Sequence, residues 1–104
     1  MWRRAAVEAA ERTVYKKILA AHLASARHPR LSVDDFLRPL LAPEERATEA
    51  YDTYDYLQGR TPEFRAFLVA ALGYADEEAA RRELEAEYGE ALRGRLAWYE
   101  QTGR

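Results

Sequence analysis

The two histidines are the first candidates for chemistry in this chain, because imidazole binds metals and moves protons near neutral pH. His22 and His28 are six positions apart, and Pro29 should end a helix between them. Neither has a Glu-x-x-His or His-x-x-x-His partner that would bring two ligands to one helical face. The chain has no cysteine, which excludes thiolate ligands and disulfides. We therefore predict no metal site, and we interpret His22 as a core residue and His28 as a turn residue.

Residues suited to nucleophilic or acid catalysis also lack the necessary context. The only serines are Ser25 and Ser32, and Ser32 stands where the next helix needs an N-cap. No segment resembles a nucleophile elbow or a phosphate-binding glycine loop. The acidic pairs at 34–35 and 44–45 fall in expected first turns of helices, where the helix dipole accounts for them. We predict no catalytic residue, no cofactor and no enzymatic activity.

Aromatic side chains are better candidates for binding a protein partner. Within the segment 51–56, Tyr51 and Tyr54 share the apolar helical face, whereas Tyr56 points nearly the opposite way, among acidic residues. An exposed tyrosine is favoured in interfaces, although a neighbouring helix would explain Tyr56 equally well. The sequence leaves these two interpretations open.

Two tryptophans lie near the chain ends, where a small domain has little surface to conceal them. We predict a homodimer built around Trp98 and Tyr99 with help from the first helix, since two-fold pairing is the commonest assembly of soluble proteins. The alternative is that Trp2 and Trp98 only cap the intramolecular core. The candidate partner-binding residues are thus Trp2, Tyr56, Trp98 and Tyr99.

The charge is unevenly distributed along the chain. Residues 1–42 contain 8 basic and 4 acidic side chains, and residues 43–104 contain 8 basic and 14 acidic ones. We favour the interpretation that the two parts pack on each other. The alternative is an anionic ligand, nucleic acid included, bound by basic residues of the first helix. Those candidate anion-binding residues are Arg3, Arg4, Arg12, Lys16 and Lys17.

A helix-turn-helix over residues 68–84 was the other hypothesis for nucleic-acid binding. Its second helix would begin with Asp76, Glu77 and Glu78, which would meet phosphates with like charge. We do not favour DNA recognition by this segment.

The elements that position these residues are predicted to be five helices in an all-α, bundle-like single domain over residues 1–104. Strand-like alternation is missing throughout. We expect the last helix, whose apolar stripe is continuous, to organise the others, and its glycines, Gly89 and Gly94, to allow a bend. The predicted helices are Trp2 to Arg27, a short one after Ser32 that Pro39 interrupts, Pro43 to Gln58, Thr61 to Leu72 closed by Gly73, and Asp76 to Gln101.

The two long helices, first and last, are predicted to pack antiparallel, with Trp2 and Trp98 at the same end of the molecule. The apolar faces predict a core centred on one set of large side chains, of which a buried phenylalanine should contribute about 3–5 kcal/mol. This set is Phe36, Phe64, Phe67, Leu68, Leu72, Leu84 and Tyr88.

Location and source can be inferred only broadly. No apolar run is long enough to span a membrane, and the N-terminus lacks the hydrophobic region of a signal peptide, so we predict a cytoplasmic protein. With 14 arginines, 2 lysines and no asparagine, the composition is thermophile-like. Our functional hypothesis is a non-enzymatic helical interaction module that acts by self-association or as a small subunit or regulator of a larger assembly. The alternative is a nucleic-acid-associated protein that uses the basic N-terminal half.

Overall fold

The structure is a computed structural model that describes the backbone of residues 2–102 and the side chains of residues 9–58 and 60–102. It contains five α-helices and, within the described residues, no strand, which confirms the all-α prediction. Short 3₁₀ turns at Arg38–Leu40, Pro43–Ala47 and Gln58–Arg60 join some of them. The helices are α1 (Trp2–Arg27), α2 (Val33–Leu37), α3 (Glu49–Leu57), α4 (Thr61–Ala71) and α5 (Glu77–Thr102).

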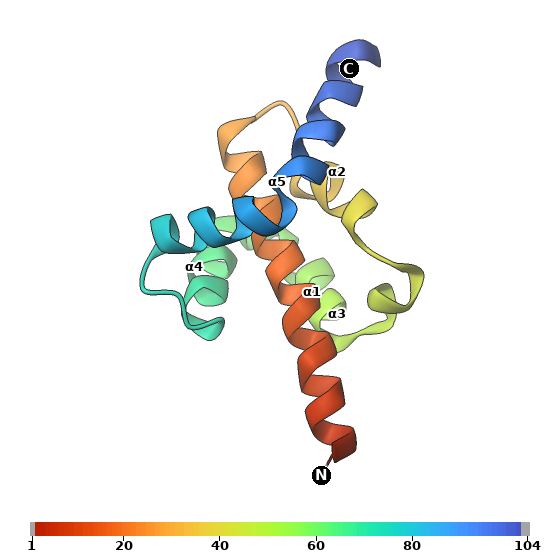
Figure 1. Ribbon diagram of the computed structural model, residues 1–104, viewed down its shortest axis with the longest axis vertical. Helices are drawn as coiled ribbons and strands as arrows, with labels where there is room; N and C mark the ends of the chain where they lie inside the picture. Colours follow the sequence, from red (N-terminus) through yellow and green to blue (C-terminus); the bar gives the residue numbers. More distant parts are fainter. Residues whose placement is uncertain (1, 103–104) are drawn as a thin grey trace.

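Helix α1, and not α5, organises the fold. It packs against each of the other four α-helices (Figure 1). Every residue from Ile18 to Leu23 is buried, so this part of α1 is covered on all sides. The alanines within it, Ala20 and Ala21, let neighbouring helices approach closely. The prediction that the last helix is central was wrong, because most of its exposed side chains are charged and only one face meets other helices.

Helices α1 and α5 cross instead of lying side by side. Lys16 pairs with Glu87 and Arg27 with Glu85, at 2.8 and 3.3 Å. The two basic residues are about 16 Å apart along α1, whereas the two acids are only about 3 Å apart along α5. The start of α1 and the end of α5 lie at opposite ends of the long axis of the molecule (Figure 1).

The antiparallel prediction was therefore wrong, although the side chain of Trp2 lies outside the described residues. The physical reason is that α5 divides its contacts among α1, α2 and α4. Helix α2 lies beside its second half, where Arg95 and Tyr99 contact Asp35. Helix α5 is unbroken at Gly89 and Gly94, and its ribbon changes direction about half-way along (Figure 1).

Local capping sets most of the helix boundaries as the sequence predicted. The Ser32 hydroxyl accepts a hydrogen bond from the Asp35 amide at 3.2 Å, and the Asp35 carboxylate accepts one from the Ser32 amide at 2.8 Å. The Asp76 carboxylate accepts a bond from the Ala79 amide at 2.8 Å and so caps α5. Gly73 ends α4 with a φ of 82°, a conformation that glycine adopts without strain.

The predicted helix from Pro43 to Gln58 is divided in two. Thr48 adopts an extended backbone conformation between the 3₁₀ turn and α3. Its hydroxyl accepts a hydrogen bond from the Tyr51 amide at 3.2 Å, so Thr48 is the N-cap of α3. Threonine competes for its neighbours' backbone groups in this way, and here that interaction starts a new helix.

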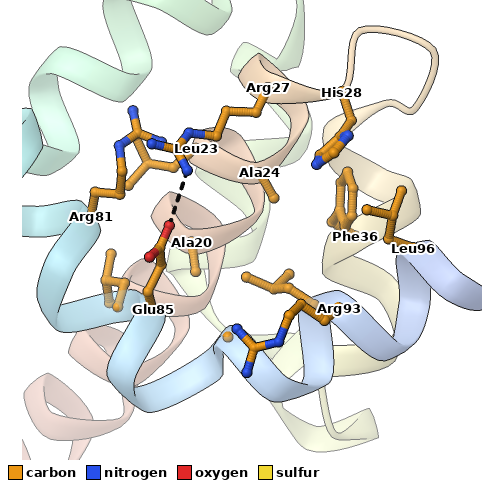
Figure 2. Close-up of a pocket in the computed structure, with 13 residues that line it drawn as sticks. Ala20, Leu23, Ala24, Arg27, His28, Phe36, Arg81, Glu85, Arg93 and Leu96 are labelled. Atoms are coloured by element: carbon orange, nitrogen blue, oxygen red, sulfur yellow. Dashed lines mark hydrogen bonds and ion pairs between the residues drawn. The ribbon is translucent and has the colours of Figure 1, made fainter.

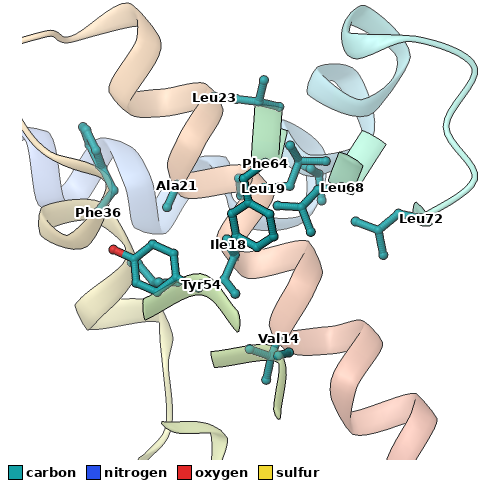
Figure 3. Packing of buried hydrophobic residues seen from close by; sticks show 14 of the residues in the cluster. Val14, Ile18, Leu19, Ala21, Leu23, Phe36, Tyr54, Phe64, Leu68 and Leu72 are labelled. Carbon is teal, nitrogen blue, oxygen red and sulfur yellow. The ribbon is translucent and has the colours of Figure 1, made fainter. Parts of the chain in front are cut away.

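The core lies where the other helices meet α1 (Figure 3). Helix α4 and its C-cap, Leu72, contribute an i, i+4, i+8 ridge of Phe64, Leu68 and Leu72, which leaves Phe67 at its edge and 52% exposed. The placement of Phe67 and of the half-buried Tyr88 at the core centre was therefore wrong. The core centre also contains residues of α1 and α3 that the predicted set did not include, which are Val14, Ile18, Leu19 and Tyr54.

Candidate docking groove

A groove runs between the C-terminal half of α1 and helix α5 (Figure 2). Its first cavity has a volume of about 280 Å³, and a larger second cavity of about 450 Å³ lies beside it, along the segment 28–31. The two cavities share Arg27, His28 and Leu96 as lining residues, so they adjoin each other, and we describe them together as the groove. Along α5 this groove extends from Arg81 to Glu100.

Both walls of the groove are stripes at helical spacing. Helix α1 contributes Ala20, Leu23, Ala24 and Arg27. Helix α5 contributes a stripe at helical spacing, which is Arg81, Glu85, Gly89, Leu92 and Leu96. Alanine on one wall and Gly89 on the other leave space where larger side chains would close the gap. The floor is apolar and consists of Ala20, Leu23, Ala24, Phe36, Leu84, Leu92 and Leu96.

The rim of the groove is mainly positive. Arg27 pairs with Glu85 at 3.3 Å, and Arg81 lies 3.3 Å from Glu77. Arg30 and Arg93 are exposed and form no ion pair with any side chain that the structure describes. The groove is thus lined by four arginines and two glutamates, on a chain whose net charge is −2.

The terminal aromatics join α5 to α2. The Arg95 guanidinium lies 4.5 Å from the centre of the Trp98 ring, and its Nε donates a hydrogen bond to the Asp35 carbonyl at 3.0 Å. The Tyr99 hydroxyl donates to the Asp35 carboxylate, and this hydrogen bond raises the pKa of Tyr99. Tyr99 lines the end of the groove, whereas Trp98, 43% exposed, does not line it.

Another predicted partner-binding residue, Tyr56, is separate from the groove. Tyr56 on α3 is 86% exposed and does not line it. The side chain of Trp2 is outside the described residues. Tyr99 therefore lines the groove, Trp98 lies beside the end of the groove, and Tyr56 is exposed elsewhere on the surface.

Three of the five candidate anion-binding residues contact groups within the chain. Arg12 donates to the Leu72 carbonyl at 3.0 Å, Lys16 pairs with Glu87 on α5, and Lys17 pairs with Glu45 at 2.8 Å. These contacts join the basic part of the chain to the acidic part, as the packing interpretation expects. The side chains of Arg3 and Arg4 lie outside the described residues.

His22 lies in the core, only 2% exposed, on the face of α1 that meets α3 and α4. Its ring makes edge contacts with Tyr54 and Phe64, with ring centres 6.3 and 5.7 Å away. Burial, and then the charge of Arg65, lower the pKa of His22 to about 4, so the ring is neutral at pH 7. Its buried Nε2 has no hydrogen-bond partner among the described residues. His28, by contrast, lies against Phe36 where the two parts of the groove join.

The groove itself was not predicted from the sequence. Its signal was present in the small residues Ala20, Ala24 and Gly89, but it becomes a cavity only because α1 and α5 cross. Within the side chains described, no three histidine, aspartate or glutamate residues come together in a way that could hold a metal ion. No helix in residues 2–102 has the length and apolar content needed to cross a bilayer. Comparisons with protein families, with characterised proteins and with solved structures gave no match.

Proposed function

We propose that this protein is a non-enzymatic helical interaction module that binds a helix of another polypeptide in the groove between α1 and α5. The observation that carries this proposal is the apolar floor between two helical walls, of which Ala24, Leu92 and Leu96 remain only partly buried. Proteins commonly recognise an amphipathic helix by laying its apolar face in such a groove. The module acts by self-association or as a small subunit or regulator of a larger assembly.

The dimensions of the groove suit a helical ligand. From Leu84 to Tyr99 the α5 wall is about 22 Å long, which corresponds to about four turns of a docked helix. Packed helices have axes about 8–10 Å apart, and the closest approach requires small side chains at the contact. Ala24 provides such a small side chain on the groove's surface, whereas Ala20 and Gly89 are buried beneath it.

The alternative function is association with nucleic acid through the basic first helix. Arg12, Lys16 and Lys17 contact groups of the chain itself, which supports the docking proposal over this alternative. Retention on heparin or DNA distinguishes the two, because phosphate contacts make affinity fall steeply with salt. We expect little retention at low salt.

Site-specific photo-crosslinking tests the docking proposal. A photoreactive residue is placed at Ala24, inside the groove, and in a matched control at Ala70, which is exposed on α4 outside it. In a lysate of the source organism, we expect an adduct from position 24 and none from position 70. Excess unlabelled wild type should compete for this adduct, whereas the folded double variant Leu92→Glu/Leu96→Glu should not.

The mass of the adduct identifies the mode of action. A mass of two chains indicates self-association, and any other defined mass indicates a subunit of a different assembly. Equal adducts from both positions, or competition by the double variant, would contradict docking in this groove.

A further inference from the structure

Two arginines without ion-pair partners line the groove, one in each of its two cavities. Arg30 belongs to the segment that follows α1, and Arg93 belongs to α5. Both are exposed, and neither pairs with any described side chain. The other two arginines of the rim have acidic neighbours within the chain, Glu85 for Arg27 and Glu77 for Arg81. Unpaired positive charge is therefore present on the α5 side of the first cavity, at Arg93, and on the side of the second cavity formed by the segment after α1, at Arg30.

Arg93 leans over the floor instead of extending away from it. Its Nη1 lies 3.0 Å from the point where a Cβ on Gly89 would stand. The guanidinium thus covers Gly89 and lies on the surface of α5 that a docked helix would meet. A carboxylate on the flank of that helix could lie beside the Arg93 guanidinium. A residue larger than glycine at position 89 would obstruct this place.

We infer that the partner of this groove is an amphipathic helix whose apolar ridge is flanked on both sides by acidic residues. The inference rests on the proposed docking function. The ridge would cover Leu92, Leu96 and the rest of the floor, and carboxylates on its two flanks would meet Arg30 and Arg93. A guanidinium binds a carboxylate with two parallel hydrogen bonds, which fixes the orientation of the helix as well as attracting it.

The apolar floor makes a nucleic acid the weaker choice for this positive rim. A phosphate backbone contacting Arg30 and Arg93 would leave the leucines between them without an apolar partner, whereas an amphipathic helix covers both kinds of surface. A second copy of this chain is also less suitable, because the exposed acidic stretch of α5 offers only alanines, Ala86 and Ala91, as a ridge.

Fluorescence anisotropy with designed peptides tests the inference. The probe is a labelled helical peptide of about four turns with leucines at i, i+4 and i+7 and glutamates on both flanks. A matched peptide carries glutamine in place of every glutamate, and a random DNA duplex is the third ligand. The proteins are the wild type, the double variant Arg30→Gln/Arg93→Gln, and Arg60→Gln, which removes an exposed arginine outside the groove.

The expected result is that wild type binds the glutamate peptide about tenfold more tightly than the glutamine peptide, as two exposed charge pairs would give. The double variant should lose this preference, and Arg60→Gln should retain it. Equal binding of both peptides, or no binding of either, would overturn the acidic-partner inference. So would a duplex whose binding depends on Arg30 and Arg93, since the rim would then recognise phosphates.

Failure of this inference can be told apart from failure of the proposed function. A groove-specific adduct at Ala24 together with equal binding of the two peptides would leave docking intact and remove only the acidic signature. Absence of that adduct together with absence of peptide binding would remove both.

Discussion

The buried His22 makes a specific prediction about acid stability. Its pKa is lowered from 6.5 to about 4 in the folded protein, chiefly by burial and further by the charge of Arg65. An unfolded chain therefore binds a proton at this side chain at a higher pH than the folded chain does. Between those two pKa values the unfolded state binds more protons, so stability rises with pH across this window.

The magnitude follows from the size of the shift. One pKa unit corresponds to 1.36 kcal/mol, so the protonation of His22 should lower the free energy of unfolding by about 3 kcal/mol between pH 7 and pH 4. No discount for solvent is needed, because the side chain is only 2% exposed. The loss should begin below about pH 6.5 and be nearly complete near pH 4.

The variant His22→Leu isolates this contribution, since leucine has a similar volume and no ionisable group. Because Nε2 of His22 makes no hydrogen bond to the described residues, the substitution should cost little stability at pH 7. Urea unfolding at pH 7 and pH 4, followed by circular dichroism, should show a loss about 3 kcal/mol smaller in the variant than in the wild type.

The contributions of other acid-sensitive groups to the pH dependence of stability are the same in wild type and variant, so they cancel in this comparison. Burial raises the pKa of Glu45, but hydrogen bonds from Lys17 and the Ala42 amide outweigh it, so the pKa is lowered. Protonation of Glu45 in acid therefore also destabilises the fold. This loss is equal in both proteins. The variant His28→Gln serves as the control for removing an imidazole. If wild type and His22→Leu lost the same stability between the two pH values, the argument from burial would be refuted.

Three further predictions concern packing, capping and assembly. Leu68→Ala should lower the free energy of unfolding by about 2–5 kcal/mol, because Leu68 is fully buried, and Phe67→Ala should lower it by less, as measured by urea unfolding. Ser32→Ala removes the hydroxyl of the capping box and should cost about 1 kcal/mol in the same assay. Trp98→Glu should shift a homodimer towards monomer in sedimentation velocity, and a wild type that stays monomeric at high concentration would contradict the predicted dimer.

Local signals in the sequence predicted the helix boundaries well. The helix ends are marked by the capping box at Ser32, the N-cap at Asp76 and the closing Gly73. Each depends on contacts with residues only a few positions away, so it forms independently of the remaining fold. Thr48 shows the limit of this approach. A threonine within a helical pattern can continue the helix or cap a new one, and only the structure shows that it caps α3.

Tertiary relations were much harder to predict. A helical wheel shows which face of α5 is apolar, but not whether that face meets one helix or two, and so the crossing with α1 was missed. Phe67 is one position away from the ridge of Phe64 and Leu68, a difference of rotation that the periodic pattern does not resolve. The groove depends on the first of these errors, because its walls come from α1 and α5, whose relative orientation was predicted incorrectly.

The carboxylate of Asp35 belongs to two parts of the structure that are far apart in sequence. One oxygen completes the capping box at the start of α2, and the other accepts the hydrogen bond of Tyr99 near the end of α5. Opening of the first turn of α2 and detachment of the last turns of α5 should therefore be a single cooperative event. In hydrogen exchange, amides of these two segments should report the same opening free energy, and Tyr99→Phe should lower it in both. Because those turns of α5 form a wall of the groove, a partner bound there would slow exchange at the start of α2 without touching it.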